Sequence, residues 1–185
     1  MRIYTRKGDD GTTGLLFGGR VAKNSPRIET NGAVDEAQAA LGVARAESES
    51  GSELDGLLVA IERDLYVLMA EVATADKNRS KLVAGTSLVT PGMVDALEAR
   101  IDGLGERTEM PTEFVIPGAN RRAAALDVAR TAVRRAERVA VAEPIAGSLV
   151  TAYLNRLSDL LWTMARWQEG DEHLEARGER KKKER

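Results

Sequence analysis

The chain has 185 residues and a formal net charge of −2, from 27 basic and 29 acidic side chains. This length is enough for one domain with its own core, and the balanced charge gives no global field that would attract nucleic acid or an anionic membrane. The chain contains no cysteine and one histidine, His173, in a polar C-terminal stretch where we expect it to be exposed. This argues against Cys nucleophiles, a Ser-His-Asp triad and metal sites built on Cys or several His residues.

No apolar run approaches the roughly 20 residues that cross a bilayer, and the first residues lack the apolar core of a signal peptide. We therefore expect a cytoplasmic protein that binds neither membranes nor nucleic acid. The aromatic content of 4% and the alanine-rich periodic stretches favour helices packed through small side chains over a β-sandwich or barrel.

The predicted elements are a glycine-rich loop followed by five helices. Residues 1–25 are rich in Gly and Thr without a helical period, which predicts an extended loop with room for a short hairpin. The run Phe114–Gly118 ends in a turn signal and cannot be a helix interior. We expect a single all-α domain over residues 1–185, a five-helix bundle with the loop across one end and a charged tail, 171–185, that frays. Helical spacing of apolar residues places the helices over about residues 31–46, 54–72, 91–104, 119–142 and 149–167.

The N-terminal segment T-R-K-G-D-D-G-T-T-G, residues 5–14, combines glycines with hydroxyl and cationic side chains. Glycines let the backbone turn so that successive amide groups converge on an anion. This predicts a phosphate cradle, although the segment has no Walker motif and fits a tight hairpin equally well. Lys23, shortly downstream, is either another phosphate contact or a solvated loop lysine. The glycines and donors of the predicted cradle are Thr5, Arg6, Lys7, Gly8, Gly11, Thr12, Thr13 and Gly14.

The segment R-T-A-V-R-R-A-E-R, residues 130–138, predicts a cationic stripe on the fourth helix. Residues four apart share a helix face, so Arg130, Arg134 and Arg138 line up, with Glu137 beside them. Guanidinium groups stay charged at any working pH, and their forked donors match phosphate and carboxylate oxygens. The stripe therefore indicates a polyphosphate site, although taken alone it fits a solvated helix face with intrahelical ion pairs better.

Two further groups of polar residues lie on predicted helices. Asp35 and Glu36 open the first helix, where a carboxylate stabilises the positive end of the helix dipole. Alternatively, Asp35 pairs with an arginine of the stripe or orients a ligand. On the last helix, Asn155, Arg156 and Asp159 interrupt an apolar stripe. Because buried polar groups need partners, this cluster predicts a site, an interface or a hydrogen-bond network between helices.

These segments together resemble one family. The loop at 5–14, the arginine segment at 130–138 and the segment Y-L-N-R-L-S-D at 153–159 are similar, in order and spacing, to PduO-type ATP:cob(I)alamin adenosyltransferases. Shorter matches at 20–23, 32–36 and 114–118 extend the resemblance from residue 4 to about residue 167. It implies transfer of the 5′-deoxyadenosyl group of ATP to the cobalt of reduced cobalamin, giving adenosylcobalamin and triphosphate. It also implies a homotrimer of five-helix bundles with active sites between subunits.

The resemblance also assigns roles to residues. Phe114 is the apolar wedge that keeps the lower cobalamin ligand away from cobalt. Arg130 pairs with Asp35 across the subunit interface, and Arg134 binds the triphosphate; these four form the expected catalytic set. Magnesium is held by the ATP phosphates rather than by protein ligands, and a reductase and a cobalamin-dependent mutase are implied partners. The expected nucleotide contacts are Thr5, Lys7, Gly8, Asp9, Gly11, Thr12, Lys23, Arg134, Glu137 and Asn155, with Arg6 and Thr13 of the same loop.

The sequence departs from the family pattern at three places. The usual Pro-Gly-Gly is Pro117-Gly118-Ala119, the usual histidine before the arginine segment is Asp127, and Trp162 stands where phenylalanine is common. None of these residues is assigned to the phosphates, so the departures bear on the corrin side.

Two other classes of protein fit the sequence less well than an enzyme does. A non-catalytic helical assembly, in which the arginines only build subunit contacts, does not require three glycines flanked by hydroxyls and cations. A nucleic-acid-binding protein is disfavoured by the acidic balance, the few aromatic residues and the lack of a recognisable module.

Overall fold

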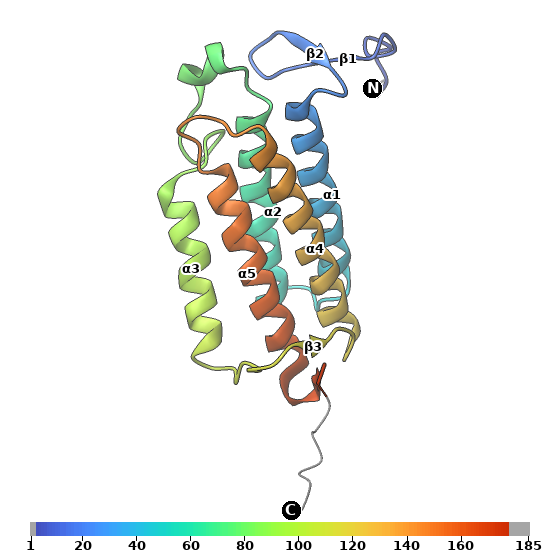
Figure 1. Ribbon diagram of the computed structural model, residues 1–185, viewed down its shortest axis with the longest axis vertical. Coiled ribbons are helices and arrows are strands. Elements are labelled where there is room, and N and C mark those ends of the chain that lie inside the picture. The colour runs from blue at the N-terminus through green and yellow to red at the C-terminus, as the bar shows by residue number, and fades with distance from the viewer. Residues whose placement is uncertain (1–2, 178–185) are drawn as a thin grey trace, which may run out of the picture.

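The computed structural model describes residues 3–177, and these are mostly helical, as predicted. The helices lie side by side in an elongated bundle, in which α4 packs against α1 and α5, α5 packs against α3, and α1 packs against α2 (Figure 1). The α-helices are α1 (Pro26–Ala46), α2 (Glu53–Val72), α3 (Pro91–Gly105), α4 (Arg121–Ala142) and α5 (Val150–Glu169). Two 3₁₀-helices, η1 (Asp76–Lys81) and η2 (Gly170–Glu172), follow α2 and α5.

The core is built from the apolar positions that recur at helical spacing. Removing these side chains from water is the main favourable term in folding. Tyr153 of α5 is also fully buried, and its hydroxyl donates to the Asp64 carboxylate of α2 at 3.0 Å. On α1 and α4 many of the buried residues are small, which lets the two helices approach closely: Ala33, Ala37, Ala129, Val133 and Ala136.

Polar side chains mark three of the helix starts. Ser52, Thr90 and Asn120 each accept a hydrogen bond from a backbone N–H in the first turn of α2, α3 and α4, respectively. The start of α1 was predicted too late, near residue 31. The helix begins at Pro26, because proline has no N–H to lose in a first turn and its fixed φ suits a helix.

Two short antiparallel ribbons lie at opposite ends of the bundle. β1 (Thr12–Gly14) pairs with β2 (Arg20–Ala22), which realises the hairpin in the N-terminal segment. β3 (Val115–Ile116) pairs with β4 (Leu174–Glu175), and the Ala176 amide donates to the Phe114 carbonyl at 2.6 Å. The tail that we expect to fray from residue 171 includes the end of η2 and all of β4, and β4 lies against β3. Residues 178–185 lie outside the described range.

No helix in the described range is long and apolar enough to cross a lipid bilayer.

Candidate functional site between α4 and α5

Two arginines of the predicted stripe on α4 meet Asn155 of α5 at one open cavity of about 310 Å³. Arg134, Glu137 and Arg138 line it from α4, together with Val141, and Asn155 lines it from α5. The Asn155 amide donates to a Glu137 carboxylate oxygen at 3.0 Å, so the two helices present a fixed amide–carboxylate pair beside the arginines. The cluster on α5 divides here, because Arg156 and Asp159 pair with each other and Arg156 also binds Glu98 of α3.

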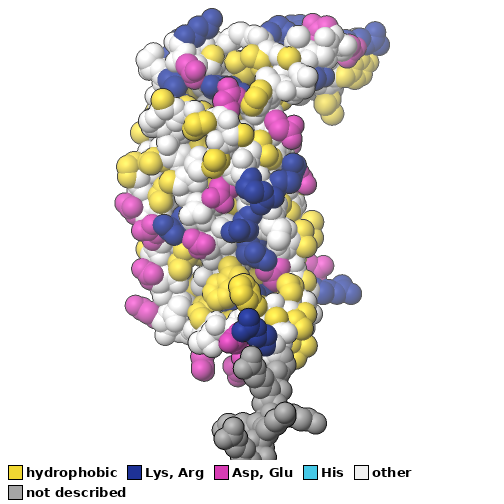
Figure 2. Space-filling view, in the orientation of Figure 1, with side chains coloured by type: hydrophobic (Ala, Val, Ile, Leu, Met, Phe, Trp, Pro, Cys, Tyr) yellow, Lys and Arg dark blue, Asp and Glu magenta, His cyan; other side chains and the backbone are white. Residues whose placement is uncertain are grey.

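The arginines of α4 differ in whether their charge is already neutralised. Within residues 3–177, Arg134 and Arg138 form no ion pair, whereas their neighbour Arg135 pairs with Glu36 and Glu29 of α1. Figure 2 shows basic side chains in a band over the groove between α4 and α5, above an apolar patch. The unpaired guanidinium groups make this cavity an attractive site for an anion.

Arg130 is separated from the other two arginines of the stripe. It does not line the cavity; its Nε donates to Asp127 at 2.9 Å. Asp35, the predicted partner of Arg130, is exposed on α1 and forms no ion pair within the described part of the chain.

The glycine-rich loop is organised by two residues to which the sequence had assigned no role. Arg20 donates to the Thr12 side chain and to the carbonyls of Lys7 and Thr12, and so ties the loop to β2. Asp10 accepts from the Thr12 amide and hydroxyl, and these hydrogen bonds hold the pKa of Asp10 below its usual value. Spacing alone offered no signal for either contact, because the side chains meet only when the hairpin closes.

Glycine is required at two positions of the loop. Gly11 has a φ of +80°, in the left-handed region that favours glycine. A Cβ at Gly8 would lie 3.1 Å from the Lys23 ammonium nitrogen and 3.2 Å from the Thr12 carbonyl oxygen. The loop therefore brings the Lys23 ammonium group close to the backbone at Gly8.

The loop and the arginines lie at the same end of the bundle. Asn24, which follows Lys23, shares a cavity of about 460 Å³ with Arg138 and Arg135. Residues 5–13 line neither this cavity nor the one at Arg134. The N-terminal segment instead extends beyond the top of α1, away from the helices (Figure 1). Within one chain, the predicted loop residues and the Arg134 cavity are thus at the same end of the bundle but do not line a common cavity.

Phe114 lies at the other end of the groove. It is 85% exposed and lines an open cavity of about 330 Å³ with Trp162 of α5. The sequence had connected Trp162 with the corrin side only as a departure from the family pattern and had given it no role in a site. The remaining lining residues are Pro111, Thr112, Glu113 and Arg177.

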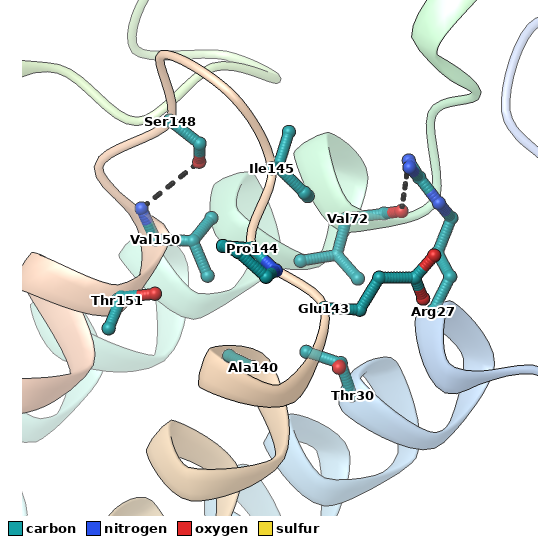
Figure 3. Close-up of a pocket in the computed structure, with 10 residues that line it drawn as sticks. All are labelled: Arg27, Thr30, Val72, Ala140, Glu143, Pro144, Ile145, Ser148, Val150 and Thr151. Atoms are coloured by element: carbon teal, nitrogen blue, oxygen red, sulfur yellow. Dashed lines mark hydrogen bonds between the residues drawn. The ribbon is translucent and has the colours of Figure 1, made fainter.

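A smaller cavity, of about 80 Å³, lies where the α4–α5 connection passes over α1 and the end of α2 (Figure 3). Arg27 reaches it, but its guanidinium is already used by the carbonyls of Val72 and Thr74 and by Asp76. No predicted site residue lines this cavity. The cavity is small, and its arginine already has hydrogen-bond partners, so we assign no ligand to it.

Among residues 3–177, no three His, Cys, Asp or Glu side chains converge as metal ligands.

The fold and the site define a class of protein: a helical bundle whose α4–α5 groove holds arginines without an ion-pair partner among residues 3–177, with a glycine-rich loop at the same end. The profile of one family, described as cobalamin adenosyltransferase, matches residues 3–168, and the chain belongs to this family.

Individual relatives agree with the family assignment. The chain is 42% identical over 171 residues to the corrinoid adenosyltransferase of Citrobacter freundii, covering 91% of this chain and 95% of that one. It is 40% identical over 170 residues to the corrinoid adenosyltransferase of Mycobacterium tuberculosis, covering 89% and 87%. It also resembles the solved structure of a variant PduO-type ATP:corrinoid adenosyltransferase from Lactobacillus reuteri, complexed with cobalamin and ATP. That similarity has a TM-score of 0.80, 31% identity and 91% coverage of both chains.

Proposed function

We propose that this protein transfers the 5′-deoxyadenosyl group of ATP to the cobalt of reduced cob(I)alamin, giving adenosylcobalamin and triphosphate. The observation that carries the proposal is the α4–α5 cavity, where Arg134 and Arg138 have no ion-pair partner in the described chain and flank the Glu137–Asn155 pair. Membership of the cobalamin adenosyltransferase family supports the same reaction.

The reaction is a displacement at the ribose 5′-carbon. The reduced cobalt of the corrinoid substrate supplies the electron pair for the new cobalt–carbon bond. The bond from the 5′-carbon to oxygen breaks, and triphosphate leaves with its electron pair. The protein therefore has no need of its own nucleophile or general base. Its task is to align the two substrates and to neutralise the charge that develops on the leaving group.

Arg134 is the residue best placed for that charge. It is exposed at the cavity, and a guanidinium offers two parallel donors to phosphate oxygens. Glu137 and Asn155 contact the nucleotide beside it. The loop supplies backbone amides and donors for the remaining contacts, with magnesium arriving on the ATP phosphates as part of the substrate. The loop residues in this proposal are Thr5, Arg6, Lys7, Gly8, Asp9, Gly11, Thr12, Thr13 and Lys23.

Phe114 acts on the corrin side of the site. An aromatic ring that is 85% exposed carries an unfavourable contact with water, which a flat apolar ligand face would relieve. The neighbouring Trp162 widens the apolar surface. We place Phe114 as the wedge that keeps the lower cobalamin ligand away from cobalt.

The active form is a homotrimer with sites between subunits. Asp35 is exposed on α1, and Arg130 of a neighbouring subunit, whose Nε donates to Asp127, would give Asp35 the partner that the family resemblance implies. A reductase that supplies cob(I)alamin and a mutase that uses the product are the partners expected from the chemistry.

The test is anaerobic incubation of the protein with ATP, magnesium and chemically reduced cobalamin, followed by absorbance spectroscopy. We expect the cob(I)alamin spectrum to give way to that of a light-sensitive cobalt–carbon product, with one triphosphate released for each. A helical assembly without catalytic activity would leave the spectrum unchanged, and that result would refute the proposal.

The Arg134→Ala variant tests the site itself. Removing an oriented cation from the leaving group should lower turnover about 100-fold or more and weaken ATP binding, with an unchanged far-UV spectrum. Arg121→Ala is the matched control, because Arg121 is an exposed arginine at the far end of the same helix. Wild-type turnover in Arg134→Ala would contradict the assignment.

A further inference from the structure

A buried carboxylate on α4 forms ion pairs with two arginines, one on α4 and one on α5. Asp127 is 5% exposed. One of its oxygens accepts from Arg130 Nε at 2.9 Å, and the other accepts from a terminal nitrogen of Arg166 on α5 at 2.6 Å. Arg166 is itself buried and also donates to Glu169 at 2.9 Å. The four side chains form a closed cluster at the interface of α4 and α5.

The geometry at Arg130 is what makes this cluster relevant to a ligand. Asp127 engages only the Nε of Arg130, whose two terminal nitrogens form no hydrogen bond with residues 3–177. A quarter of the Arg130 side chain remains exposed, and none of its nitrogen atoms is among the buried polar atoms without a partner. The Arg130 side chain is therefore fixed at its Nε, while its two terminal nitrogens stay accessible.

We propose that Asp127 is a positioning residue, which fixes Arg130 so that its two terminal nitrogens face the bound substrate and the neighbouring subunit. This inference rests on the proposed function, because it assumes that Arg130 acts at the adenosyl-transfer site. Arginine has substantial side-chain freedom in water, and a side chain fixed before binding loses less entropy when a ligand arrives.

The charges of the cluster indicate what Arg130 contributes. Two carboxylates, Asp127 and Glu169, balance two guanidinium groups, so Arg130 adds little net positive charge to the groove. Net attraction for an anion comes instead from Arg134 and Arg138. Arg130 therefore contributes donors of fixed direction, and its value depends on the orientation that Asp127 imposes.

The same carboxylate also supports the corrin end of the groove. The Arg166 guanidinium lies 5.9 Å from the centre of the Trp162 ring, and Trp162 lines the cavity that contains Phe114. Asp127 thus joins Arg130 of the predicted stripe to an arginine that lies against Trp162.

The orientation of Arg130 can be measured without turnover, from the Nε–Hε signals of arginine in ¹⁵N–¹H spectra of the whole protein. A guanidinium held by a buried carboxylate should give an Nε–Hε signal that exchanges slowly with water. The Arg130 signal is identified by its loss in Arg130→Lys. We expect it to shift and exchange faster in Asp127→Asn, and to stay in place in Glu169→Gln, which alters only the contact of Arg166. An unmoved signal in Asp127→Asn overturns the proposal.

A double-mutant cycle in the adenosyl-transfer assay tests the functional part. Asp127→Asn should lower kcat about tenfold, as expected for losing one charge-assisted hydrogen bond, with a smaller change in the KM for ATP. In the Arg130→Ala background the same substitution should change kcat less than twofold, because the residue that it positions is gone. An equal loss in both backgrounds means that Asp127 serves the fold alone, and overturns the proposal.

The Arg130→Lys variant keeps the test decisive if Asp127→Asn does not fold. Lysine retains the charge, but a lysine ammonium held by Asp127 leaves no separate terminal nitrogens for a ligand, so its turnover should match that of Arg130→Ala. Wild-type turnover in Arg130→Lys overturns the positioning role. If the wild-type protein itself forms no cobalt–carbon product, the proposed function fails, and the Nε–Hε signals still decide whether Asp127 fixes Arg130.

Discussion

Arg134 and Arg135 are adjacent in the sequence but differ in the use of their charge. Successive residues of a helix are rotated by about 100°, so the two side chains leave α4 in different directions. Arg135 meets Glu36 and Glu29 of α1, whereas Arg134 meets the open cavity beside Asn155. The number of arginines on α4 therefore overstates the positive charge that is available to a ligand. The arginines of the candidate site are those without a carboxylate partner within residues 3–177.

At the proposed corrin end of the groove, we expect Phe114→Ala to affect the reactions of cobalamin and to leave ATP binding unchanged. Because Phe114 lies away from the Arg134 cavity, ATP affinity measured by calorimetry should stay within about twofold of the wild type. Reduction of bound cobalamin and adenosylation should both slow, since the lower cobalt ligand is no longer kept away. The free energy of unfolding should change little, because the ring is mostly exposed.

The matched variant is Phe114→Leu, which keeps an apolar side chain and should retain part of the rate. An unchanged adenosylation rate in Phe114→Ala would remove Phe114 from the proposed site. A large loss of ATP affinity would show instead that the two cavities act as one.

At the scale of elements, a buried carboxylate joins α2 to the connection that follows it. Glu71 is fully buried and accepts from Arg79 of η1 at 2.9 Å and from the Val89 amide at 2.8 Å. These contacts hold the segment between α2 and α3 against the bundle. They also satisfy a backbone N–H that would otherwise be buried without a partner.

We expect Glu71→Ala to lower the free energy of unfolding by about 3–5 kcal/mol, because it leaves Arg79 and the Val89 amide without their acceptor. Glu53→Ala, on the same helix, is the control. Glu53 pairs with Arg107 at the half-exposed surface, where such pairs contribute about 1 kcal/mol or less. Denaturant titrations of both variants measure the difference, and equal losses would contradict this account of Glu71.

The sequence was most informative where local rules decide the structure. Helical spacing predicts most helix positions, and the structure adds caps at Ser52, Thr90 and Asn120, whose residue types are among those that favour capping. Contacts between distant segments were not predictable in this way. The pairing of β3 with β4 joins residues near 115 to residues near 175, and two-residue strands have no periodic pattern to detect.

The same distinction holds for the candidate site. The family resemblance assigns Arg134, Glu137 and Asn155 to one nucleotide, and in the structure these three residues line one cavity. The sequence did not predict the hydrogen bonds of Asp127 with Arg130 and Arg166. It also did not predict the role of Arg20 in the loop. Both depend on which side chains of separate elements face each other, and a single sequence does not give that information.

At the scale of the whole molecule, the N-terminal loop extends past its own bundle rather than over the Arg134 cavity (Figure 1). In a homotrimer, this arrangement favours a site that combines the loop of one subunit with the arginines of the next. Light scattering should then give a mass of about 60 kDa, three times the 20.0 kDa of one chain.

Subunit mixing tests such a shared site. Gly8→Val should disable the loop, because a side chain there crowds Lys23 and the Thr12 carbonyl, and Arg134→Ala disables the cavity. Each variant alone should be nearly inactive. Trimers refolded from an equal mixture should recover roughly a quarter of the wild-type activity, since each mixed trimer contains one intact pair of surfaces. No recovery would place the loop and arginine in the same chain.

The distance along α5 between the two cavities is useful for inhibitor design. Asn155 at the arginine cavity and Trp162 at the apolar cavity are seven residues apart on one face of this helix, a rise of about 10 Å. A compound that joins a polyphosphate mimic to a flat aromatic group through a spacer of that length would engage both cavities at once. Its second contact then forms at a high effective concentration, so two weak fragments combine into a tight and selective ligand.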